Sequence, residues 1–137
     1  LGDVYKRQEL KDFYSGYGKE AEGSQSIFQT YKETGYVLDP HTAVAKVVAD
    51  HYAYEQGRRD KCLVVSTASP YKFSQTVLKA LKEPVPKDVF EGIEALEKLW
   101  KEPIPAPVKE VEEGEIRHST VCSVEDMEAT VSHFLLS

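Results

Sequence analysis

Residues 62–70 read Cys-Leu-Val-Val-Ser-Thr-Ala-Ser-Pro, and this stretch decides the fold that the sequence predicts. Residues 62–65 form a continuous apolar run, which is typical of a strand covered on both faces of a sheet. Ser69 and Pro70 then predict a helix start, because serine caps a helix well and proline suits its first position. We therefore expect a buried strand, a small polar turn at residues 66–69, and a helix, in that order.

Helices are predicted on both sides of this strand. Asp39 followed by Pro40 repeats the cap-then-proline pattern, while Gly35 and Gly57 stand where helices are expected to stop. The expected helices cover residues 24–34, 40–56, 70–82 and 88–101, and a last helix follows residue 123. The predicted fold class is α/β, with helices around a small, mostly parallel sheet and a helical C-terminal tail.

The tail carries one strongly apolar helix face. Ile93, Leu96 and Trp100 recur at helical spacing, and we expect them to pack back onto residues 40–82 or onto the last helix, because exposing such a face is costly. Prolines between residues 103 and 107 predict a stiff, extended linker. Residues 116–122 are ambiguous, with an edge strand as one interpretation.

Composition and charge narrow the class of protein. The 137 residues suit one domain, and the net charge is −6. Residues 1–82 hold 12 Lys/Arg against 10 Asp/Glu, whereas residues 83–137 hold 5 against 13, so the second part is acidic. An acidic tail argues against nucleic acid as a partner. No apolar run is long enough to span a membrane, and no signal-peptide pattern is present, so a cytoplasmic location is expected.

Several residues invite chemical interpretations that the sequence does not support. Cys62 and Cys122 lack the spacing of a zinc site or a disulfide framework, and we expect buried thiols. The sequence contains no Gly-x-Ser-x-Gly elbow, glycine-rich phosphate loop or His-Glu-x-x-His motif. Catalysis by this chain alone is therefore not expected.

Two motifs stand out when they are taken together. Residues 35–45 read Gly-Tyr-Val-Leu-Asp-Pro-His-Thr-Ala-Val-Ala, and residues 64–73 read Val-Val-Ser-Thr-Ala-Ser-Pro-Tyr-Lys-Phe. In this order and at this separation they resemble the threonine synthase family, in its bacterial and fungal branch. Ser69 departs from the family pattern, which has histidine at that position. The resemblance is clear over residues 20–82.

The resemblance implies a fold-type II enzyme that depends on pyridoxal 5'-phosphate and converts O-phosphohomoserine and water to threonine and phosphate. It also implies that a hydroxyl at the end of a late strand faces the pyridine nitrogen of the cofactor. Thr67 matches that position. Ser66 is its neighbour, and only one of the two is expected to reach the ring, since side chains alternate along a strand.

The resemblance further implies four pocket-lining residues, each of which also has a purely structural interpretation. Asp39 and Ser69 are helix caps in either case, and His41 is either part of the pocket or a solvated imidazole. Lys72 lies in the first turn of a helix, where the dipole does not favour a cation, so a specific anionic partner or a solvated surface position would explain it.

The sequence also predicts that the chain is part of a larger enzyme. Residues 3–8, Asp-Val-Tyr-Lys-Arg-Gln, match a translated transposon-end adapter, so residues 1–8 are expected to be non-native, with a natural helix start as the alternative. Residues 9–82 would then be the C-terminal part of the catalytic domain, and residues 83–137 its acidic helical tail. The family's Schiff-base lysine would lie in the missing N-terminal part, which is the expected partner.

Two alternatives remain open at this stage. One is another fold-type II enzyme, such as a dehydratase or a relative of cysteine or tryptophan synthase. The other is a non-catalytic α/β interaction or regulatory module, whose contact surface would be the acidic tail.

Overall fold

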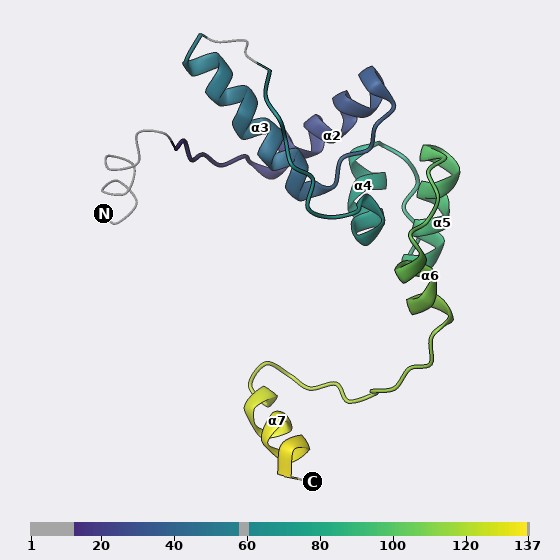
Figure 1. The fold of residues 1–137 in the computed structure, drawn as a ribbon. Coiled ribbons are helices and arrows are strands. Elements are labelled where there is room, and N and C mark those ends of the chain that lie inside the picture. Colours follow the sequence, from purple (N-terminus) through teal and green to yellow (C-terminus); the bar gives the residue numbers. More distant parts are fainter. Residues whose placement is uncertain (1–12, 58–60, 137) are drawn as a thin grey trace.

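The computed structural model describes residues 13–57 and 61–136, and every regular element in these residues is a helix (Figure 1). The residues before 13 include the segment predicted to be non-native, which therefore lies outside the described residues. The elements are α2 (Glu20–Thr34), α3 (Pro40–Glu55), the 3-10 helix η1 (Pro70–Phe73), α4 (Ser74–Ala80), α5 (Val89–Trp100), α6 (Ala106–Glu113) and α7 (Met127–Leu136).

The predicted α/β fold class is wrong, because the described residues contain no strand and no sheet. Residues 61–67 have no regular secondary structure, since a strand is stable only beside a second strand that pairs with its N–H and C=O groups. No backbone hydrogen bond found between described residues outside the helices involves this stretch. Leu63 is 88% exposed and Val65 is 66% exposed, so the run is not covered on both faces as predicted.

Helix starts and stops follow the local signals in the sequence. The Asp39 carboxylate caps α3, with Pro40 at its first position, and the Ser69 hydroxyl caps η1 in the same way before Pro70. Gly35, which follows α2, has a φ of 75°, in the left-handed region where only glycine is unstrained. The predicted helix over residues 70–82 is confirmed, although its first turn is a 3-10 helix.

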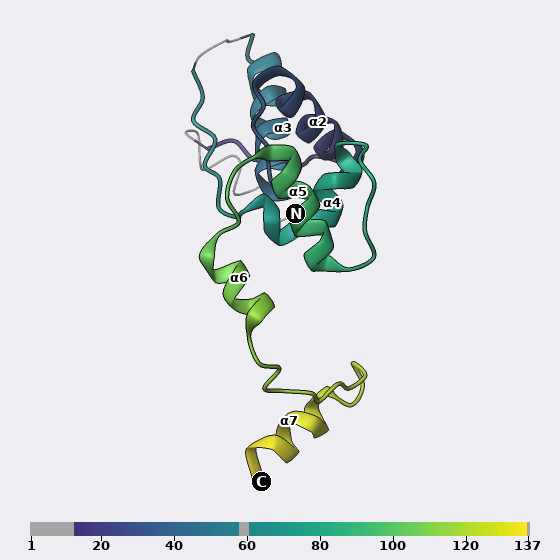
Figure 2. The same ribbon diagram turned by 90° about the vertical axis from the view of Figure 1, so that its right-hand side faces the viewer.

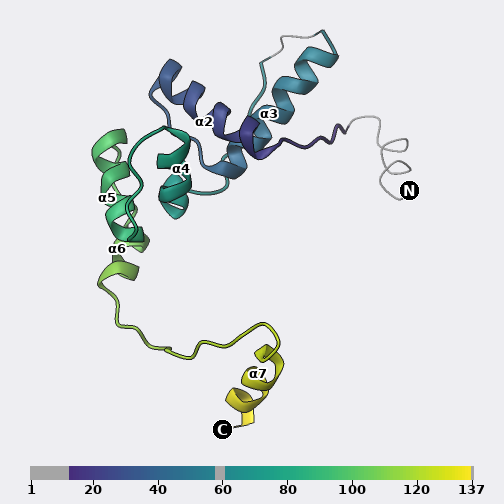
Figure 3. The same cartoon turned by 180° about the vertical axis from the view of Figure 1, so that it is seen from behind.

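The core lies where α2, α4 and α5 meet. The views of Figures 1 and 3 agree that α4 lies between the α2–α3 pair and α5. The largest fully buried apolar side chains of this core are Ile27, Val37, Tyr71, Val77, Leu78 and Leu96. Ile93 is also buried, and the Trp100 ring lies 5.8 Å from the rings of both Tyr36 and Tyr71. The prediction that the apolar face of α5 packs back onto the preceding part of the chain is confirmed.

The tail departs from the prediction in two places. Residues 103–107 are not simply an extended linker, because α6 begins at Ala106 with Pro107 in its first turn, where the missing N–H costs nothing. Residues 116–122 are extended and exposed and form no strand. Figures 2 and 3 show α7 beyond this segment, apart from the other helices, and none of its described residues is buried.

Both cysteines are exposed and free, so the expectation of buried thiols is wrong. They lie in two segments without regular secondary structure, one between α3 and η1 and one between α6 and α7. Among the described residues, no helix is both long enough and apolar enough to cross a membrane.

Candidate functional site

The Asp39 carboxylate organises the beginning of α3. Its side chain is fully buried, and its Oδ1 atom accepts the backbone N–H groups of His41 at 2.9 Å and of Thr42 at 3.3 Å. The Thr42 hydroxyl donates to Oδ2. Three donors within one helical turn therefore satisfy a carboxylate that has almost no contact with water.

Ser66 brings a second segment of the chain to the same carboxylate. Its hydroxyl lies 3.4 Å from Asp39 Oδ2, 3.2 Å from the Thr42 hydroxyl and 3.3 Å from the backbone oxygen of Ala68. A hydroxyl has one hydrogen to donate, and a charged acceptor forms the stronger bond, so the contact with Asp39 is favoured. The segment after residue 65 is thus tied to the N-terminus of α3.

The electrostatics of Asp39 reflect two opposing effects. Burial raises the pKa of its carboxyl group, because the charged form loses hydration. Hydrogen bonds from the Thr42 hydroxyl, from the backbone N–H groups of His41 and Thr42, and from the His41 ring outweigh burial and lower the pKa below its ordinary value. Asp39 is therefore a carboxylate at neutral pH, and it is the acceptor in every contact that it makes.

His41 lies at the edge of this cluster. Its Nδ1 atom is 3.3 Å from Asp39 Oδ1, and its ring centre is 5.0 Å from that of Phe73 in η1. The His41 side chain is 66% exposed, so the imidazole remains accessible to a ligand or to solvent.

Thr67 is placed differently from its neighbour. It is exposed, and none of the hydrogen bonds found between described residues involves its side chain. The hydroxyl of Ser66 is engaged with α3, whereas that of Thr67 is available to a ligand. The two side chains thus differ in their hydrogen-bond partners, while the prediction that only one of them reaches the cofactor ring stays a prediction.

Ser69 and Lys72 belong to a second group. They border an apolar groove of about 450 Å³ between η1, α5 and α6, which does not include Asp39, His41, Ser66 or Thr67. The Ser69 hydroxyl accepts the N–H of Tyr71 at 3.3 Å, which confirms its role as a cap. The Lys72 ammonium lies 5.8 Å from the centre of the Phe73 ring. Phe73 therefore lies beside His41, which belongs to the Asp39 cluster, and beside Lys72, which borders the groove.

The sequence analysis missed Thr42. Its side chain is buried and joins Asp39 to Ser66. The signal was present, because Asp39 is a predicted helix cap and Thr42 lies three positions after it. Side chains at these two positions can reach each other. Its contact with Ser66, which is 24 residues further along the chain, could not be read from spacing.

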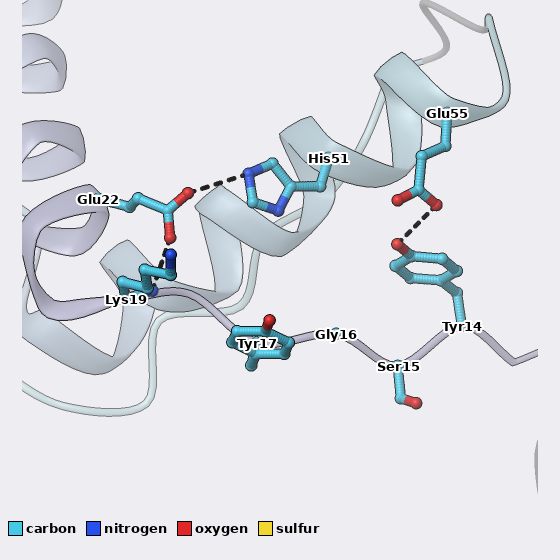
Figure 4. A pocket seen from close by; sticks show the side chains of 8 residues that line it. All are labelled: Tyr14, Ser15, Gly16, Tyr17, Lys19, Glu22, His51 and Glu55. Atoms are coloured by element: carbon cyan, nitrogen blue, oxygen red, sulfur yellow. Dashed lines mark hydrogen bonds and ion pairs between the residues drawn. The ribbon is translucent and has the colours of Figure 1, made fainter. Parts of the chain in front are cut away.

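A further hollow, of about 400 Å³, lies between the segment before α2 and the last turns of α3 (Figure 4). Across it, Glu22 lies 3.4 Å from the His51 ring, and the Tyr14 hydroxyl donates to Glu55 at 2.8 Å. None of the predicted site residues lines this hollow. In the part of the chain that the structure describes, no group of three or more His, Cys, Asp or Glu side chains could hold a metal ion.

A family model described as "Threonine synthase, C-terminal" matches residues 42–131. This match covers more than half of the chain. The chain belongs to the threonine synthase C-terminal family. The match includes Thr42, Ser66 and Thr67, and it continues through the tail into α7, well beyond the residues that carried the resemblance.

Similar proteins are found in mammals. The chain is 44% identical over 72 residues to "Threonine synthase-like 1" of Macaca fascicularis, and 43% identical over 72 residues to the protein of that name in Homo sapiens. The protein of that name in Mus musculus is 42% identical over 71 residues. The matches cover 53%, 53% and 52% of this chain, but in each case only 9% of the relative.

Family membership supports the predicted resemblance to threonine synthases, while the bacterial and fungal branch stays a prediction. The chain matches only about a tenth of the length of these relatives, so their similarity does not establish the activity of the whole protein.

Proposed function

We propose that this chain is the C-terminal part of a threonine synthase that uses pyridoxal 5'-phosphate to convert O-phosphohomoserine and water to threonine and phosphate. Membership of the threonine synthase C-terminal family supports this proposal. The observation that carries it is the difference between two adjacent hydroxyls: that of Ser66 is hydrogen-bonded to Asp39, whereas none of the hydrogen bonds found between described residues involves the Thr67 side chain.

Thr67 has the chemistry that the cofactor ring requires. When bound, pyridoxal phosphate supplies an electron sink that stabilises negative charge on the substrate carbon. The Thr67 hydroxyl would form a hydrogen bond with the pyridine nitrogen. Because a hydroxyl is not charged, it does not hold a proton on that nitrogen as a carboxylate would, which suits an elimination followed by addition of water.

The substrate is an anion, and the structure limits which residues could bind it. A helix N-terminus favours anions through its free N–H groups, but those of His41 and Thr42 already donate to the Asp39 carboxylate. Asp39 is also negatively charged and would repel a phosphate. We therefore assign Asp39 no substrate contact, and we propose that Lys72 and His41, whose side chains are exposed, face the substrate. Ser69 remains a cap at the border of the groove.

The test compares two hydroxyl deletions in the full-length enzyme. Thr67→Val keeps the shape of the side chain but removes one hydrogen bond, which costs about 0.5–1.5 kcal/mol for a neutral pair. We expect cofactor affinity to fall several-fold, and kcat to fall as well, because the ring electronics matter most in the transition state. Cofactor affinity is measured by titration of the apoenzyme, and turnover by phosphate release.

Ser66→Ala is the matched comparison, since it removes a hydroxyl from the adjacent residue. We expect a smaller loss of cofactor affinity than for Thr67→Val. A Thr67→Val enzyme that binds cofactor and turns over like the unmodified protein, beside an impaired Ser66→Ala enzyme, would show that the wrong hydroxyl has been assigned.

A further inference from the structure

Asp39 makes contacts that a helix cap does not need. Its Oδ1 atom accepts the two backbone N–H groups at the start of α3, which is the whole of the capping interaction. Its Oδ2 atom instead accepts two hydroxyls, one from Thr42 and one from Ser66, which is 27 residues away. One oxygen therefore holds the helix and the other holds a different segment.

Asp88 shows what an ordinary cap looks like in the same chain. Its Oδ1 atom accepts the N–H groups of Phe90 at 2.8 Å and Glu91 at 3.0 Å at the start of α5. Asp88 is exposed, and no hydrogen bond found between described residues joins its carboxylate to another segment. Capping thus requires neither burial nor a hydroxyl partner. Burial of a carboxylate is costly, so the additional contacts of Asp39 call for a second role.

We propose that Asp39 is a positioning residue for Thr67. This inference rests on the proposed function, in which the Thr67 hydroxyl meets the cofactor ring. By holding the Ser66 hydroxyl, Asp39 fixes the backbone of residues 66–68 against α3. Because Thr67 follows Ser66 directly in the chain, fixing Ser66 against α3 restricts the backbone positions, and therefore the side-chain directions, that Thr67 can adopt.

The first experiment separates the two roles of Asp39 in the 137-residue chain. Asp39→Ser replaces one good capping residue with another, so α3 is expected to remain. The serine side chain is too short to reach Ser66, so the hydrogen bond between these two residues is lost. The matched control, Asp88→Ser, makes the same change at the cap that has no such link. We expect ¹⁵N relaxation to show increased motion of residues 66–68 in Asp39→Ser alone, with equal helix content in both variants. Equal mobility of residues 66–68 in both variants would overturn the proposal.

The second experiment uses the full-length holoenzyme and reads the cofactor directly. Asp39→Ser should shift the absorption maximum of the bound cofactor in the same direction as Thr67→Val, and should lower kcat several-fold with little change in KM. Asp88→Ser should leave the spectrum unchanged. Ser66→Ala should cause a similar but smaller shift than Asp39→Ser, because it removes the same link from its other end without changing α3.

The double variant Asp39→Ser/Thr67→Val distinguishes the two proposals. If Asp39 acts through Thr67, its substitution has no further effect on kcat once the Thr67 hydroxyl is gone. Effects that multiply would show that Asp39 acts elsewhere, and would overturn the positioning role while leaving Thr67 in place. A spectrum unaffected by Thr67→Val, but shifted by Asp39→Ser, would instead overturn the proposed function at Thr67.

Discussion

At the scale of single residues, the Asp39 carboxylate explains why residues 66–68 lie where they do. It receives donors from α3 and from Ser66, and its charge is offset by hydrogen bonds in place of a cation. Such a group is stabilising only while it is ionised, because a protonated carboxyl accepts hydrogen bonds more weakly and must donate one of its own. The stability of the fold should therefore depend on pH through this residue.

The sign of that dependence follows from the lowered pKa of Asp39. Because the folded pKa lies below the ordinary value of 3.8, the unfolded chain binds the proton first as pH falls. The stabilisation is complete above pH 3.8 and is lost as pH falls through the folded pKa. We expect the free energy of unfolding of the unmodified protein to exceed that of the Asp39→Ser variant by about 1.5–3 kcal/mol at neutral pH. A difference of this size is typical of hydrogen bonds to charged groups.

Urea unfolding of both proteins between about pH 5 and pH 2.5 measures this difference. The difference in free energy of unfolding should shrink toward the acid end. A difference that is constant or that grows on acidification would contradict the account of Asp39.

Single residues also show which features of the site could be predicted from the sequence. The caps at Asp39 and Ser69 follow from local spacing, and both are confirmed. That only one of Ser66 and Thr67 reaches the cofactor ring stays a prediction, and the partner of Ser66 was not predicted. That partner is 27 residues away, and only the folded chain brings the two side chains together.

At the scale of elements, a buried tyrosine joins η1 to the residues after α5. Tyr71 is 1% exposed, and its hydroxyl donates to the backbone oxygen of Glu102. Burial raises the pKa of Tyr71, as do the nearby charges of Glu97 and Glu102, so the hydroxyl keeps its proton as a donor. This bond, together with the one from the Ile104 N–H to the Glu97 carboxylate at 3.2 Å, holds the chain where it leaves α5.

Tyr71→Phe should therefore lower the free energy of unfolding by about 1 kcal/mol, since a buried acceptor loses its partner. Tyr31→Phe is the matched control, because the Tyr31 hydroxyl lies 3.5 Å from the backbone oxygen of Leu99 and so makes a weak bond. Urea unfolding of the two variants measures both effects. An equal or larger loss in Tyr31→Phe would show that the Tyr71 bond is not stabilising.

The elements were predictable where their signals are local. Cap residues, proline and periodic apolar positions correctly indicated α3, α4 and α5. Residues 62–65 gave the wrong result because an apolar run indicates that a segment needs to be covered, whereas a strand also needs a pairing partner. Within the described residues the chain supplies neither a cover for this run nor a strand to pair with it. Leu63 and Val65 are therefore exposed.

At the scale of the whole molecule, the helical core and the tail differ in burial and in charge. The buried side chains lie between Ser26 and Ile104, and α6 and α7 contain none. Residues 83–137 hold 13 of the 23 acidic residues but only 5 of the 17 basic ones. Of the predicted site residues, Asp39 and His41 lie at the start of α3, Ser69 and Lys72 at the start of η1 and within it, and Ser66 and Thr67 in the segment that joins the two helices.

The whole molecule also bears on whether the 137-residue chain can catalyse the reaction by itself. Its predicted site residues include hydroxyls, an imidazole and an ammonium group, and the Schiff-base lysine that the resemblance implies is not among them. We therefore predict that catalysis requires the full-length enzyme, in which we propose that this chain forms one side of the cofactor site.

The most direct test is to supply O-phosphohomoserine and pyridoxal 5'-phosphate to the full-length enzyme, and separately to the 137-residue chain, and to measure threonine and phosphate together. We predict equal amounts of threonine and phosphate from the full-length enzyme and neither product from the chain alone. A full-length enzyme that binds the cofactor but releases no phosphate, or a 137-residue chain that catalyses the reaction by itself, would contradict the central claim.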